Sequence, residues 1–117
     1  MPRSAAAYLA DIVEACDAIE AVLRGVNLQR YQNERAIRSA VEREFILIGE
    51  AVGSLTRIDP QLSAGTSHAR LIVGFRNQLA HDYASIDDEI VLAIAQHDAS
   101  VLRGECALLL ESLGEAA

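Results

Sequence analysis

The sequence contains no tryptophan, and aromatic residues make up only 4% of its 117 residues. A core in this chain must therefore be built from Leu, Ile, Val and Ala, which suits the packing of helix on helix. Hydrophobic residues account for 51% of the composition, which is too apolar for an intrinsically disordered chain. The length fits one domain, and we expect a single domain over residues 1–117.

Lysine is also absent, so all 10 basic residues are arginines, against 17 acidic residues and a formal net charge of −7. Affinity for nucleic acid comes largely from neutralising phosphates, and an acidic chain does not attract a polyanion by its bulk charge. If this protein handles RNA, the contact must come from a local cluster of arginines.

Cysteine and long apolar runs are scarce. Cys16 and Cys106 lie on separate apolar segments and are interpreted as reduced core thiols, because a cysteine metal site needs more ligands at closer spacing. No run approaches the ~18 apolar residues that a membrane span requires. Asp11 interrupts the apolar N-terminal stretch, which is therefore unlike a signal peptide. We expect a cytoplasmic protein with no metal, no cofactor and no membrane contact.

Apolar residues recur at three- and four-residue steps, the period of an amphipathic helix. The expected helices cover approximately residues 4–24, 33–55, 67–81 and 85–113. Ser4 is the expected N-cap of the first helix and Gly25 its end, while Ser85 begins a capping box ahead of the last helix. The stretch Asp59–Ser67 is predicted to be a loop. No segment alternates with a period of two, so the sequence predicts an all-α, up-and-down four-helix bundle.

One apolar stripe on each helix is expected to face the core. The residues of these stripes are Leu9, Ile12, Val13, Cys16, Ile19, Leu23, Ile37, Val41, Phe45, Ile48, Val52, Leu55, Leu71, Ile72, Phe75, Leu79, Ile90, Val91, Ile94, Val101, Leu102, Leu109 and Leu113. The second helix is also apolar all round at residues 45–48, which indicates burial on more than one side. In a short chain, one of those sides could be a partner subunit.

The segment around the end of the third helix crowds together Arg76, Asn77, His81 and Tyr83. Histidine can take or give a proton near pH 7, and arginine presents a planar fork of donors that fits a phosphate. Such a pair suffices to help a 2′-hydroxyl of RNA attack its neighbouring phosphodiester, without a metal. Asn77 lies one turn before His81 and could orient its imidazole.

Each of these residues also has an ordinary structural interpretation. Arg76 could be a surface salt-bridge residue, His81 a cation favoured by the helix C-terminus, and Tyr83 a ring packed beneath the turn. The spacing of Arg76 and His81 alone is common enough to arise by chance. Arg76 and His81 are offset by about 140° around a helix. A long arginine side chain can bridge this offset. Alternatively, a two-fold dimer would bring Arg76 of one chain beside His81 of the other.

The wider context of this segment resembles the HEPN superfamily, in its HepT-like branch. Phe75, Arg76, Asn77, Leu79, His81, Tyr83, Ile86 and Asp87 match the family's signature, and residues 48–51 (Ile-Gly-Glu-Ala) match a stretch on its second helix. The loop before the third helix lacks the tryptophan that family members often carry. The resemblance spans approximately residues 5–113.

This resemblance implies a homodimeric helical bundle whose two motifs meet in a cleft, with Arg76 and His81 catalytic. It implies a metal-independent endoribonuclease that cleaves tRNA or mRNA as the toxin of a toxin–antitoxin pair. The implied partner is a minimal nucleotidyltransferase of the MntA type, which silences the toxin by transferring AMP to Tyr83. Glu50, in the second matching stretch, could support Arg76, although an exposed or structural role is the simpler interpretation.

A second hypothesis is a catalytically silent binding module that docks the nucleotidyltransferase and presents Tyr83 to it. A weaker third is an oligomerisation bundle without chemistry, which would leave the grouping of Arg76, His81 and Tyr83 unexplained. Arg35, Arg38 and Arg43 could add positive potential for RNA, but a solvated helix face is their ordinary interpretation. His68 and His97 are interpreted as structural.

Overall fold

A computed structural model describes residues 3–66, 69–81 and 87–116, with the backbone alone described at 69, 70, 76, 79–81, 115 and 116. Every regular element in these ranges is helical, and none is a strand. In chain order they are α1 (Ala5–Leu23), α2 (Leu28–Asn33), α3 (Arg35–Ile58), α4 (Pro60–Ser63), α5 (Ala69–His81), α6 (Asp88–Ala93), the π-helical segment η2 (Ile94–Asp98) and α7 (Ala99–Ala116).

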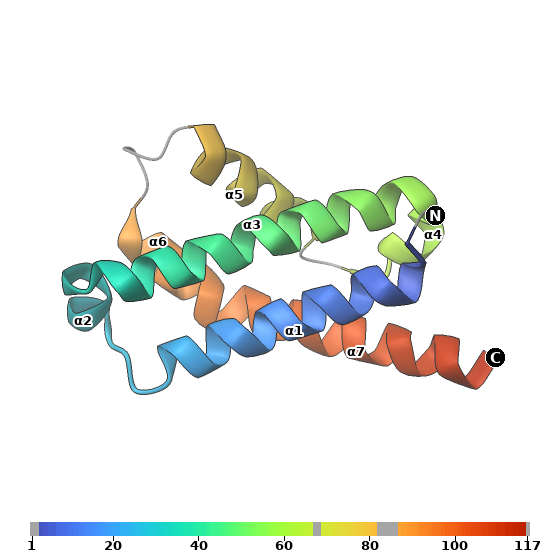
Figure 1. The fold of residues 1–117 in the computed structure, drawn as a ribbon, viewed down its shortest axis with the longest axis horizontal. Coiled ribbons are helices and arrows are strands. Elements are labelled where there is room, and N and C mark those ends of the chain that lie inside the picture. The colour runs from blue at the N-terminus through green and yellow to red at the C-terminus, as the bar shows by residue number, and fades with distance from the viewer. Residues whose placement is uncertain (1–2, 67–68, 82–86, 117) are drawn as a thin grey trace.

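The long helices pack as a bundle of 46 × 29 × 25 Å (Figure 1). α1 and α3 lie side by side and run in opposite directions, and α7 packs along α1. α5 packs almost entirely against α3, on the side of the molecule away from α1 (Figure 1). The predicted all-α bundle is confirmed, with the last helix continuing from α6 through η2 into α7.

The sequence dictates both ends of α1. Ser4 caps the helix by accepting a hydrogen bond from the backbone N–H of Ala7 at 3.1 Å, which satisfies a donor that has no partner within the helix. The chain then turns at Gly25, whose φ of 74° lies in the left-handed region that glycine adopts without strain. Both predictions for this helix are confirmed.

The core is built from the faces of α1, α3, α5 and the α6–α7 stretch that the apolar stripes predicted. Its fully buried members include Leu9, Ile12, Ile19, Tyr31, Val41, Phe45, Ile48, Leu55, Ile72, Val91, Leu102 and Cys106. Leu71 and Ile90 are exceptions, because they are 49% and 55% exposed although the stripes placed them in the core. Leu71 lies on α5 where no other element of the described chain covers it, and Ile90 lies in the first turn of α6.

Two short helices were not predicted. α2 is capped by Asn27 and buries Tyr31, and Arg38 of α3 donates hydrogen bonds to the carbonyl oxygens of Tyr31 and Gln32 at its end. α4 is a single turn capped by Asp59, within the stretch that was predicted to be a loop. Both are too short for apolar periodicity to reveal, and their caps are the signal that sequence reasoning passed over.

The start of the last helix differs from the prediction. Asp87, rather than Ser85, caps α6, because its carboxylate accepts a hydrogen bond from the backbone N–H of Glu89 at 2.9 Å. Ser85 itself lies outside the described residues. Farther along, η2 interrupts the α-helical bonding with i→i+5 bonds, a feature that apolar periodicity does not report.

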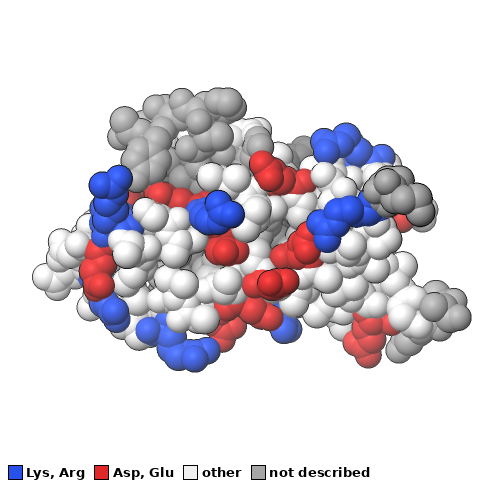
Figure 2. All heavy atoms as spheres, in the orientation of Figure 1, with Lys and Arg blue, Asp and Glu red and all other residues white. Residues whose placement is uncertain are grey.

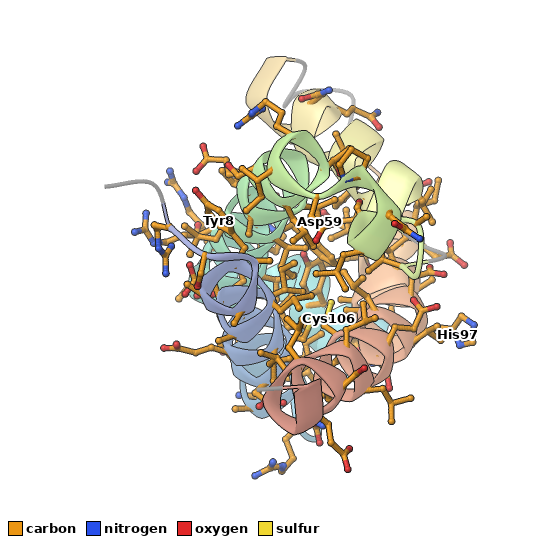
Figure 3. All side chains as sticks on the ribbon, turned by 90° about the vertical axis from the view of Figure 1, so that its right-hand side faces the viewer. Tyr8, Asp59, His97 and Cys106 are labelled. Atoms are coloured by element: carbon orange, nitrogen blue, oxygen red, sulfur yellow. The ribbon has the colours of Figure 1, made fainter. Side chains whose placement is uncertain are left out.

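The cysteines lie inside the bundle, as predicted. Cys16 of α1 and Cys106 of α7 are buried and form no disulfide, and Cys106 sits between the helices in Figure 3. Burial raises the pKa of both thiols to about 12, so neither is a reactive thiolate near neutral pH. Outside the core, Arg103 of α7 pairs with Asp17 of α1 at 2.9 Å. Within the described ranges, no helix is both long and apolar enough to cross a membrane.

Candidate active site

The motif residues that the sequence singled out lie on α5 or follow it directly. The helix is held on α3 by apolar contacts, with Ile72 fully buried and Phe75 7% exposed. The ring of Phe75 meets the ring of Phe45 edge to face, with centroids 5.1 Å apart and an interplanar angle of 84°. Such a pair adds a preferred geometry to the burial of two large side chains, and it fixes the rotation of α5 about its own axis.

Because Arg76 follows Phe75 directly, the contact between the two rings also sets the position of the Arg76 Cα around the axis of α5. Asn77, two residues beyond Phe75, is exposed. α5 ends at His81, so Asn77 and His81 share one helix at the four-residue spacing that puts them on one face. The side chains of Arg76 and His81, and all of Tyr83, lie outside the described residues, and the meeting of these groups stays a prediction.

Glu50 is exposed on α3, the helix on which α5 packs. It follows the buried Ile48 and Gly49 and precedes the buried Ala51. Glu50 lines the groove between α1 and α3, whereas α5 packs on the side of α3 away from α1. Its support of Arg76 stays a prediction.

Glu42 is an acidic residue with a perturbed environment that the sequence did not single out. It is half-buried on α3, and burial, together with the negative charge of Asp88, raises the pKa of its carboxyl, with Arg38 opposing. Asp88 is the first residue of α6. Nothing in the sequence links Glu42 to Asp88, because these two carboxyls approach each other only in the folded chain.

The arginines of α3 divide into different roles. Arg38 is half-buried and bonds the carbonyl oxygens at the end of α2, a structural role that satisfies the last carbonyls of that helix. Arg35 and Arg43 are exposed. On the face formed by α1 and α3, acidic side chains gather in the middle, with most arginines nearer the edges (Figure 2). No broad positive surface covers this face, as the net charge predicted.

Grooves lined by described residues lie elsewhere in the molecule. One runs between α1 and α3, and another lies between α1 and the η2–α7 stretch. Neither is lined by a residue of α5 in the part of the chain that the structure describes. His97 of η2 points away from the bundle (Figure 3). Among the described residues, no cluster of His, Cys, Asp and Glu is arranged to hold a metal ion.

The class that this architecture defines is an all-helical bundle carrying an arginine and a histidine on a helix attached along one side. Comparison with known families makes the class specific, because the model of the family described as "Ribonuclease HepT-like" matches residues 12–109. The chain therefore belongs to the HepT-like ribonuclease family, and the resemblance to HEPN proteins is confirmed.

Curated relatives agree with this assignment. The "Probable ribonuclease HepT" of Thermococcus cleftensis is 28% identical over 109 residues, which cover 90% of this chain and 94% of the relative. Two proteins of Methanocaldococcus jannaschii, named "Putative RNase MJ1216" and "Putative RNase MJ0125", are 26% and 27% identical. They cover 95% and 97% of this chain and 91% and 97% of their own lengths. No solved structure matches the chain significantly.

The raised pKa of Glu42 predicts a pH-dependent cost to stability. The folded state holds the proton of this carboxyl more tightly than the unfolded state, so stability falls as pH rises above the ordinary value of 4.5. We expect Glu42→Gln to raise the melting temperature modestly at pH 7, and the gain to shrink toward zero as the pH falls below 4.5. Thermal melts followed by circular dichroism from pH 3.5 to 8, roughly the window that brackets a carboxyl titration, measure this. Glu111→Gln, on the exposed surface of α7, is the control, and an equal gain from it would contradict the assignment.

Proposed function

We propose that this protein is a metal-independent endoribonuclease that acts as the toxin of a toxin–antitoxin pair. The observation that carries the proposal is the family match over residues 12–109, which includes the whole motif from Arg76 to Tyr83. The structure supports it by placing Arg76, Asn77 and His81 on one continuous helix, α5, with its rotation set by Phe75.

The proposed reaction is an internal transesterification. The 2′-oxygen of a ribose attacks the adjacent phosphorus and the bond from phosphorus to the 5′-oxygen breaks, giving a 2′,3′-cyclic phosphate and a 5′-hydroxyl. The imidazole of His81 takes the proton of the 2′-hydroxyl or returns a proton to the departing 5′-oxygen. The guanidinium of Arg76 stabilises the charge that develops on the phosphorane oxygens.

A dimer would complete this site, and α5 offers a surface for one. Leu71, Gly74 and Gln78 recur at three- and four-residue steps and are all exposed. This α5 stripe is uncharged, it contains a large apolar side chain, and glycine in its middle allows a second backbone to approach closely. A two-fold axis beside the stripe would bring α5 helices together, and with them the Arg76 and His81 of both chains.

The proposed partner is a minimal nucleotidyltransferase that transfers AMP to Tyr83. The hydroxyl of Tyr83 attacks the α-phosphorus of ATP, pyrophosphate leaves, and the hydroxyl proton passes to a base of the partner or to water. The product carries a phosphate and a nucleoside two residues from His81. The added negative charge would repel the substrate phosphate and the added bulk would fill the cleft.

The purified protein should cleave RNA in the presence of EDTA and leave 2′,3′-cyclic phosphate ends. His81→Ala and Arg76→Ala should each lower the cleavage rate by on the order of 100-fold or more, because proton transfer and charge stabilisation each contribute about that much. The measurement is the single-turnover rate on end-labelled total tRNA and on an mRNA transcript, with the product ends identified by mass spectrometry.

Matched controls for these variants lie on other helices. His97→Ala removes an exposed histidine on η2, and Arg43→Ala removes an exposed arginine on α3. Both should leave the rate nearly unchanged. If His81→Ala cut RNA as fast as His97→Ala, the catalytic assignment would be lost, and a binding module that presents Tyr83 would become the better account.

The dimer surface can be tested at Gly74. A Cβ added at this position meets no atom within 4 Å, so a side chain there leaves the fold of the single chain undisturbed. We expect Gly74→Arg to convert a dimer into a monomer by light scattering, with unchanged helicity and a loss of cleavage. Gly104→Arg on α7, where an added Cβ also meets nothing, is the matched control and should remain dimeric. A dimer that tolerates arginine at Gly74 would rule out the α5 stripe as the interface.

Modification of Tyr83 can be tested with a minimal nucleotidyltransferase of the MntA type, the proposed partner. Incubation of the two proteins with ATP and Mg²⁺ should add AMP to the wild type and abolish its RNA cleavage. Tyr83→Phe should accept no AMP and keep its cleavage activity under the same treatment, while Tyr8→Phe, on α1, should behave as the wild type. AMP found on a residue other than Tyr83 would refute this step.

A further inference from the structure

The groove between α1 and α3 has a floor of small side chains. Ala15 and Ala18 of α1 lie opposite Leu47 and Ala51 of α3, and the space above them has a volume of about 460 Å³. Leu47 is 40% exposed there, although it lies at the centre of the most apolar stretch of α3. The floor therefore leaves apolar surface uncovered along the junction of the longest helices in the bundle.

The rim of the groove carries carboxylates. Glu14 of α1 and Glu44 of α3 line it, and among the described residues neither makes an ion pair or a hydrogen bond. At one end, Asp11 pairs with Arg3, whose guanidinium also lies 5.1 Å from the centre of the Tyr8 ring. Figure 2 shows this acidic band crossing the middle of the face, and Figure 3 shows Tyr8 at the outer edge of the α1–α3 junction.

The shape of the groove fits a helix. From Tyr8 to Ala18 it follows α1 for about 15 Å at 1.5 Å per residue, the length of roughly three helical turns. Alanines on the floor let a third helix approach α1 and α3 closely, since interaxial distances depend on the side chains at the contact. A helix seated there would cover Leu47 with its own apolar stripe.

We infer that the α1–α3 groove is the docking site for an amphipathic, basic helix of a partner protein. Its apolar stripe packs on Ala15, Ala18, Leu47 and Ala51, and its Lys or Arg side chains flank that stripe and pair with Glu14 and Glu44. Complementary charge on the two sides fixes the register of such a helix and raises its association rate. This inference does not depend on the proposed ribonuclease activity.

The charge of the groove favours a basic helix over RNA or a second copy of this chain. RNA is disfavoured because a groove rimmed by carboxylates repels phosphates. A second copy of the chain is disfavoured because it carries the same net charge of −7 and does not neutralise the rim.

The test uses the full-length protein and a fluorescein-labelled synthetic helix of about 16 residues, long enough to fill the groove. The peptide carries a Leu and Ala stripe at helical spacing, with Lys and Arg on either side of it. Binding is followed by fluorescence anisotropy at about 0.15 M ionic strength, where long-range attraction is largely screened. We expect saturable binding, weakened at least about tenfold by the double variant Glu14→Gln/Glu44→Gln, which corresponds to about 1.4 kcal/mol.

A matched double variant removes the same charge elsewhere. Glu89→Gln/Glu111→Gln, at exposed positions of α6 and α7, should change the affinity by less than about twofold. Ala18→Arg places a bulky cation in the groove and should abolish binding, whereas Ala21→Arg, at an exposed position of the same helix, should not. Circular dichroism of each variant establishes that it is folded.

Several results would overturn the inference. Equal weakening by the two double variants would show attraction by bulk charge alone, and equal binding of a peptide interrupted by proline would show that no helix is recognised. Binding of a labelled single-stranded RNA oligonucleotide that is lost in Ala18→Arg but kept in Ala21→Arg would assign the groove to nucleic acid. Loss of the dimer in Ala18→Arg would assign it to a second copy. In every case the cleavage rate of the Glu14→Gln/Glu44→Gln variant reports separately on the ribonuclease.

Discussion

The contact between Phe45 and Phe75 is the constraint on which the candidate site depends. α5 packs almost entirely against α3, so this edge-to-face pair and the burial of Ile72 attach the motif helix to the rest of the bundle. A rotation of α5 about its axis would break the edge-to-face contact between these rings. Because Arg76 directly follows Phe75, a packing interaction between apolar rings sets the backbone position of the arginine that is proposed to be catalytic.

The same arrangement separates two kinds of surface. The contacts of α5 with α3 leave its uncharged stripe at Leu71, Gly74 and Gln78 open, and α1 with α3 forms a groove rimmed by Glu14 and Glu44. The proposed second copy and the proposed basic helix are suited to different faces, because like-charged copies associate best where charge is absent. Occupation of the α5 stripe would therefore leave the α1–α3 groove accessible. A second copy and a helical partner could then bind the same chain together, without one displacing the other.

The sequence predicted the long helices and most of their inner faces because the burial of an apolar stripe is a local, periodic signal. Ser4 and Gly25 mark the ends of α1, and Phe45, Ile48 and Val52 mark the face of α3, as expected. The same reasoning placed Leu71 in the core, because periodicity identifies an apolar face without showing what covers it. The chemistry of the site came from the spacing of Arg76 and His81 and from the resemblance. Glu42 escaped notice because its environment depends on Asp88, far along the chain, and no local pattern encodes that approach.

An acidic ribonuclease must solve an electrostatic problem, and the proposed dimer offers a solution. With a net charge of −7, the protein gains little from nonspecific attraction, so the phosphate must meet positive charge only where cleavage occurs. In the proposed dimer, two copies of Arg76 converge beside the α5 stripe, while the carboxylates of Glu14 and Glu44 line the α1–α3 groove. Binding then depends on a small number of charge-assisted contacts rather than on a broad surface. A single added phosphate near such a site changes its potential by a large fraction, which explains why AMP on one tyrosine would suffice to silence it.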